Sequence, residues 1–196
     1  MTRTSIHLLL AVLLFCAGCA SGAKPEAMIA QIHLPVHKSP SNVVVAVLGG
    51  RGTSIMGASQ ISDEDFAQAL RRSIEQSGLF AQALTDGLSK YLLQAFIVQV
   101  NQPMFGASMT VSMEVNYTLA RTEPKQVVWQ KAVSSTYTAP FSAAFVGATR
   151  LRLANEGAAR KNIEQAIQEM YQLQLEYCEA DRAVEETHLS LCDGPI

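Results

Sequence analysis

Charged residues are scarce in this sequence, and positive charge is nowhere concentrated. Asp, Glu, Lys and Arg make up only 16% of the 196 residues, and 15 Lys and Arg nearly balance 17 Asp and Glu, so the formal net charge is -2. Proteins that bind nucleic acids need clustered basic side chains, because phosphate contacts supply most of their affinity. We therefore expect no nucleic-acid partner.

Long apolar runs are missing after the N-terminus. No stretch beyond residue 18 reaches the roughly 20 apolar residues that cross a bilayer as a helix. We expect no transmembrane segment there, and the length of the chain fits one compact domain with tails.

Residue patterns typical of enzymes and metal sites are missing as well. The sequence has no G-x-S-x-G motif, and His188 is the only histidine beyond residue 41. His33 and His37 are four residues apart, but Pro35 between them disfavours the helix that would align them on a metal ion. The loop 49–52 matches neither glycine-rich phosphate-binding pattern. We expect a protein that is not an enzyme and has no metal or cofactor.

The first 18 residues have the layout of a secretory signal peptide. Residues 1–7 carry one Arg and no acid, residues 8–15 are all apolar, and small residues lead up to Cys19. An apolar run of about eight residues is too short to span a bilayer as a helix, so it indicates a cleaved signal rather than a membrane anchor.

Residues 14–19, Leu-Phe-Cys-Ala-Gly-Cys, resemble the lipobox of bacterial lipoproteins, although Cys16 replaces the usual Leu three residues before the acylated cysteine. The resemblance implies that Cys19 becomes a diacylglyceryl cysteine that also carries palmitate. Because Ala20 rather than Asp follows it, the resemblance implies the outer membrane of a Gram-negative bacterium, with a periplasmic domain. Several acyl chains anchor almost irreversibly. Ordinary secretion is the alternative.

Two cysteines remain after Cys16 and Cys19. Cys178 and Cys192 suggest one disulfide in an oxidising compartment, and its loop of about 15 residues would stabilise the fold by about 3 kcal/mol. Two free thiols are an alternative. A zinc site with His188 is another, although the closely spaced ligand pairs of structural zinc sites are missing.

We divide the chain into a signal peptide at 1–18, a lipidated cysteine and tether at 19–41, one domain at 42–175, and a tail at 176–196. Within the tether, residues 28–36 are apolar enough for an edge strand, where Pro35 is tolerated.

Periodicity predicts the elements of the domain. Ser62 starts a helical pattern that Gly78 ends, and residues 109–119 alternate strictly between apolar and polar. Residues 42–48 and 90–102 have apolar side chains in both phases, as in strands covered on both faces. In chain order we expect strands at 42–48 and 79–84 around a helix at 63–77, then strands at 90–102, 109–119 and 126–137, and a helix at 149–175.

This order predicts an α+β two-layer sandwich, with helices on one face of a mostly antiparallel sheet. The architecture over residues 42–175 resembles the small envelope modules of LpoB, the N-terminal region of CsgG and the N-terminal domain of TolB. The resemblance rests on element order and carries over no functional residue.

An apolar loop at 139–148, between the last strand and the last helix, contains Phe141, Phe145 and Val146. Such a loop is either tucked against the core or offered to a partner or ligand. Met104, Phe105, Met109 and Met113 could extend this surface, because methionine adapts to varied partners, although core filling is its commoner use.

Arg150 and Arg152 lie near the front of the last helix, where the helix dipole disfavours positive charge. This placement leaves room for a negative partner close to them.

These features predict a non-catalytic lipoprotein that binds an envelope protein as an accessory or assembly component, with homo-oligomerisation open. The alternative is a carrier or auxiliary protein for a lipid or another apolar ligand, held between the sheet and the 139–148 loop.

Overall fold

The computed structural model describes residues 21–32, 34–35, 39–53 and 59–173. The signal peptide, Cys19, Cys178, Cys192 and the tail at 176–196 lie outside the described residues, and their expected roles stay predictions.

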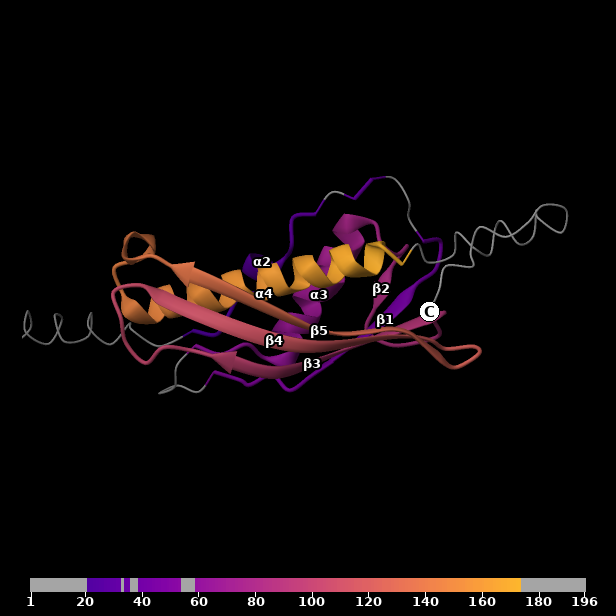
Figure 1. Cartoon of the computed structure of the whole chain (residues 1–196), viewed down its shortest axis with the longest axis horizontal. Helices are drawn as coiled ribbons and strands as arrows, with labels where there is room; N and C mark the ends of the chain where they lie inside the picture. Colours follow the sequence, from indigo (N-terminus) through magenta and orange to yellow (C-terminus); the bar gives the residue numbers. More distant parts are fainter. Residues whose placement is uncertain (1–20, 33, 36–38, 54–58, 174–196) are drawn as a thin grey trace, which may run out of the picture.

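In the described part of the chain, five strands form one sheet (Figure 1). They are β1 (Val43–Leu48), β2 (Ala83–Leu84), β3 (Tyr91–Asn101), β4 (Met109–Arg121) and β5 (Gln126–Ala139). The order across the sheet is β2-β1-β3-β4-β5. The α+β class is therefore confirmed.

The sheet is mixed. β3, β4 and β5 form the antiparallel meander that the sequence predicts, whereas β1 pairs in parallel with both β2 and β3. Parallel neighbours need a crossover connection, and here the chain returns through a helix between β1 and β2.

The first long helix, α3 (Asp63–Ser77), has the predicted bounds. The Ser62 hydroxyl accepts a bond from the backbone N–H of Asp65 at 3.1 Å, which satisfies a donor that the first turn leaves unpaired. At the other end Gly78 adopts φ 74, a left-handed conformation that glycine takes without strain. Phe66, Leu70 and Ile74 are fully buried, so this apolar face fixes the helix to the sheet.

The second long helix, α4 (Gly147–Tyr171), covers β4 and β5. Its buried residues include many small ones, which let the helix approach the sheet closely. One close approach is at Gly157, where an added Cβ would overlap the ring of Tyr137.

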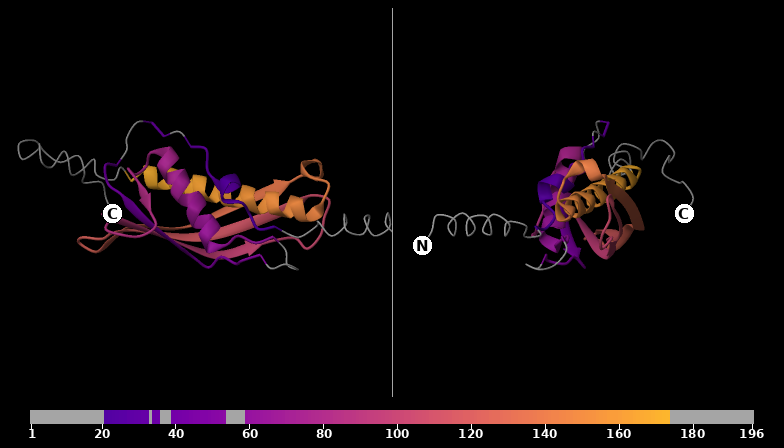
Figure 2. Two further views of the ribbon diagram at one scale, coloured as in Figure 1. Left: turned by 180° about the vertical axis from the view of Figure 1, so that it is seen from behind. Right: turned by 90° about the vertical axis from the view of Figure 1, so that its left-hand side faces the viewer.

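Both helices lie on the same side of the curved sheet (Figure 2). In β1 and β3 the residues Val45, Val47, Leu93 and Ala95 face them and are buried. The opposite face is open, since Leu48, Phe96 and Val98 are exposed. The expectation that these two strands are covered on both faces is therefore wrong for the described residues: on the second face, Val44 and Leu92 are only half-buried, and Leu48, Phe96 and Val98 form an exposed strip.

The segment before β1 differs from the expected tether and edge strand. It contains the short helix α2 (Pro25–Met28), and Met28, Ala30 and Ile32 are buried against the core. The backbone N–H of Ala30 donates to the Ser73 hydroxyl of α3 at 2.9 Å. Residues 21–32 thus belong to the folded body.

Replacing Gly157 by Ala should lower the free energy of unfolding by about 1–3 kcal/mol, because the new methyl group would overlap the Tyr137 ring. Thermal or denaturant unfolding measures this. Gly147→Ala on the same helix is the matched control, since its Cβ would meet atoms only at 3.7 Å. Equal stability of both variants would contradict the close packing of α4 on β5.

Candidate interaction surface

Two loops meet at one end of the sheet, at the left of Figure 1. One joins β3 to β4 (residues 102–108), and the other joins β5 to α4 (residues 140–146) and contains the turn of 3-10 helix η1 (Phe141–Ala143). They are neighbours because β3 and β5 both end here, whereas β4 and α4 both begin here.

Five large apolar side chains on these loops are exposed, and we call them the apolar tip. Their exposed fractions are 95% for Met104, 86% for Phe105, 56% for Phe141, 91% for Phe145 and 55% for Val146. Single exposed apolar residues are ordinary on protein surfaces, whereas clusters are typical of surfaces that contact a protein, a membrane or a ligand.

The guanidinium of Arg150 holds the two loops together. Its Nη1 donates to the carbonyl oxygens of Ala144 at 2.7 Å and Phe145 at 2.9 Å, and its Nη2 reaches the carbonyl of Gly106 at 3.3 Å. The same group lies 5.0 Å from the centre of the Phe141 ring. Because Arg150 is only 6% exposed, it acts as an internal brace beneath the tip.

The contacts of Arg150 explain how a cation is tolerated near the start of the last helix. Arg150 lies in the first turn of α4, where the helix dipole disfavours a cation. Among the described residues, loop carbonyl oxygens accept the hydrogen bonds of its guanidinium, while Arg152 lies 3.7 Å from the carboxylate of Glu156. Carbonyl oxygens and a carboxylate of the chain itself therefore make some of the contacts for which a separate negatively charged partner was considered.

The structure places the five residues of the predicted surface together in solvent. Of the two interpretations of the 139–148 loop, tucking into the core does not hold for the rings of Phe141 and Phe145. Met109 and Met113 do not extend the surface, since both are buried in the core. Sequence reasoning missed the role of Arg150. The available signal was an arginine in the first turn of a helix that follows an uncharged loop.

The N-terminal segment is fixed to α4 beside the tip. The Nη1 of Arg152 donates to the Ser21 hydroxyl at 3.2 Å, and the backbone N–H of Lys24 donates to the Glu156 carboxylate at 3.0 Å. The N–H of Ala23 also donates to the Gln60 carbonyl at 3.0 Å. The chain therefore meets the folded body at Ser21, near the start of α4.

Glu156 is buried at this junction, and burial raises the pKa of its carboxyl group. The bond from the Lys24 backbone and the charges of Arg152, Lys24 and Arg160 oppose the rise without cancelling it. The carboxylate thus fastens the N-terminal segment at a cost in desolvation.

Burial also raises the pKa of Tyr117, which lies between the sheet and α4. Its hydroxyl donates to Asn162 Oδ1 at 2.9 Å, and Asn162 Nδ2 donates to the Val133 carbonyl at 2.8 Å. These bonds join α4 to β4 and β5, so this polar network has a structural role.

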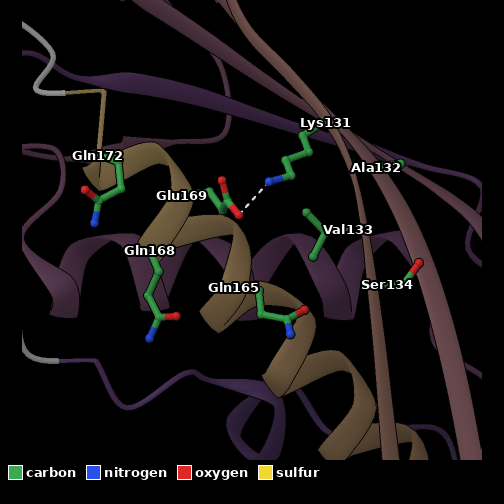
Figure 3. A pocket seen from close by; sticks show the side chains of 8 residues that line it. All are labelled: Lys131, Ala132, Val133, Ser134, Gln165, Gln168, Glu169 and Gln172. Carbon is green, nitrogen blue, oxygen red and sulfur yellow. Dashed lines mark hydrogen bonds and ion pairs between the residues drawn. The ribbon is translucent and has the colours of Figure 1, made fainter.

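A cavity of about 440 Å³ lies between β5 and α4, away from the tip (Figure 3). Lys131 and Glu169 form an ion pair of 2.6 Å in it, and Gln165, Gln168 and Gln172 supply further polar groups. With Ala132 and Val133 beside these groups, the lining is mixed rather than predominantly apolar, as the site of a wholly apolar ligand would be.

No protein-family model matches the chain, and no curated protein matches its sequence. Its fold is similar to that of protein XCC0632 from Xanthomonas campestris, of family DUF330, with a TM-score of 0.58 and 13% identity over 78% of this chain and 96% of that chain. This likeness shows a shared fold alone.

Two other solved structures are more distant. A minor lipoprotein from Acinetobacter baumannii has a TM-score of 0.45 and 8% identity, with 70% of this chain and 96% of that chain covered. For the PelC dodecamer from Paraburkholderia phytofirmans, the values are 0.44 and 12%, with 68% and 92% covered. The resemblance to LpoB, CsgG and TolB modules stays a prediction. No helix of the described residues is long and apolar enough to cross a membrane.

Replacing Arg150 by Ala should loosen both loops, because three carbonyl contacts and the ring contact are lost. We expect faster hydrogen exchange confined to residues 102–108 and 140–146, and a loss of about 1–3 kcal/mol in stability. The control is Arg160→Ala, since Arg160 also donates to a backbone carbonyl, that of Ala27, but away from the tip. Unchanged exchange in both loops of Arg150→Ala would show that they do not depend on the brace.

Replacing Glu156 by Gln should change the pH dependence of stability. The raised pKa means that the folded protein keeps a proton on Glu156 at a pH where the unfolded chain has released it. The unfolding free energy of the wild type should therefore fall, relative to the Gln variant, as the pH rises from about 4.5 toward neutrality. Denaturant unfolding across this range measures the difference, and a difference that moves in the opposite direction would contradict desolvation as the dominant effect.

Proposed function

We propose that this chain is a non-catalytic lipoprotein of the Gram-negative outer membrane. Cys19 carries the lipid anchor, and the domain works as a binding or accessory component of an envelope assembly. The apolar tip is the surface with which it contacts another envelope constituent.

The observation that carries this proposal is the construction of the tip. Five large apolar side chains from two separate loops are exposed together, and a buried guanidinium braces the loops from below. Exposed apolar groups are unfavourable in water, and a buried cation requires several acceptors. A surface that combines both features supports a role in contact.

Glu156 and Tyr117, whose pKa values burial raises, both have structural surroundings, which supports a binding role rather than a catalytic one. Glu156 fastens the N-terminal segment to α4, and Tyr117 is hydrogen-bonded inside the core. Both groups are engaged in holding the fold together.

The alternative is carriage of an apolar ligand. It would require an apolar concavity under the 139–148 loop, but Phe141 and Phe145 of this loop face solvent. The cavity between β5 and α4 has a mixed polar and apolar lining. These observations favour a contact surface over a carrier.

Photo-crosslinking in cells tests the proposal. A photoreactive phenylalanine analogue in place of Phe145 should give covalent adducts in the membrane fraction on irradiation, because the tip is in contact there. Electrophoresis and mass spectrometry identify the adducts as protein or lipid, and labelled palmitate measures acylation at the same time.

The matched control carries the analogue at Leu88, which is 99% exposed and precedes β3 at the opposite end of the sheet. It should give at most a tenth of the adducts. Adducts from neither position, or palmitate that remains after Cys19→Ser, would refute the proposed function.

A further inference from the structure

Few residues separate Cys19, the proposed site of the lipid, from residues that are held against the folded body. Ser21 is bonded to Arg152, and the following residues are packed or hydrogen-bonded, with Ala23 buried. Cys19 lies two residues before Ser21, so their α-carbons are at most about 7 Å apart. An acylated Cys19 therefore brings the membrane surface close to Ser21, whatever path the two residues take.

The point of attachment lies at the same end of the molecule as the apolar tip. Arg152, which holds Ser21, follows Val146 of the tip by six residues, or about 9 Å along α4. The turn between β4 and β5 lies at the opposite end, as both Figure 1 and Figure 2 show.

The two ends differ in charge. Residues 102–108 and 140–149 contain no Asp, Glu, Lys or Arg. At the opposite end of the sheet, charged residues lie in or next to two turns, the one before β3 and the one after β4. They are Asp86, Lys90, Arg121, Glu123 and Lys125. Arg150, beneath the tip, is buried and donates to loop carbonyl groups, so it presents no charge to solvent. An uncharged apolar end fits the boundary between headgroups and acyl chains, whereas the charged end fits water.

Resting on the proposed function, we infer that the apolar tip contacts the phospholipid surface of the membrane to which Cys19 is anchored. The rings of Phe105 and Phe145 enter the headgroup region. The acyl chains and the tip then form two contacts with one membrane. Together they fix the orientation of the domain, with the tip on the lipid and the turn between β4 and β5 farthest away.

Depth-dependent fluorescence quenching tests this inference on the mature lipidated chain. The sequence contains one tryptophan, Trp129, so Phe145→Trp combined with Trp129→Phe places a single probe on the tip. The protein is reconstituted into vesicles of phosphatidylethanolamine and phosphatidylglycerol that carry bromine on the acyl chains. We expect the fluorescence to fall by about half and to shift to shorter wavelength, as for rings at the acyl boundary.

Leu88→Trp in the same Trp129→Phe background is the matched control, and it should lose less than about a tenth of its fluorescence because bromine quenches only groups near the acyl chains. Thermal melting checks that both variants are folded.

If the protein floats with the vesicles but the probe at 145 is not quenched, the inference is overturned while the lipid anchor stands. Adducts to another protein, or to a second copy of this chain, from position 145 in cells would then identify the true occupant. Absence of lipid on Cys19 would overturn both proposals.

Discussion

The buried guanidinium of Arg150 is the constraint on which the functional end of this protein depends. A cation inside the fold, in the first turn of a helix, must find acceptors nearby, and it finds them in the carbonyl groups of the two loops. Those bonds fix the loops to each other and leave their apolar side chains outside. Burial of one charge is thus coupled to exposure of five apolar groups, which makes the surface ordered as well as apolar.

The N-terminal segment joins this end of the domain to the anchor. Its packing on α4 depends on Glu156, whose buried carboxylate accepts the bond from Lys24 and lies beside Arg152. Because Ser21 is hydrogen-bonded to Arg152 of α4, the two residues from Cys19 set how far a lipid anchor can lie from the folded body. The proposed orientation follows from this short connection together with the contact between the apolar tip and the lipid.

Much of the fold was predictable because the local signals agree with the tertiary structure. Ser62 and Gly78 bound α3 as expected, and the alternation from Met109 onward marks β4. The parallel pairing of β1 was not predictable, since periodicity does not report which neighbour a strand selects. The apolar residues of both phases in β1 and β3 suggested two covered faces, yet one face is open. Exposure of the tip depends on Arg150, and its bond to Gly106 spans 44 residues in the sequence, so no local pattern predicts that the two loops are held together.

The orientation of the domain on a lipid bilayer tests the account most directly. Neutron reflectometry of the mature lipoprotein on a supported bilayer of phosphatidylethanolamine and phosphatidylglycerol measures whether protein density begins within the headgroup layer. The account predicts continuous density from headgroups to protein, with the long axis of the sheet directed away from the surface. A layer of water between bilayer and protein, or a domain lying flat on its open sheet face, would contradict it.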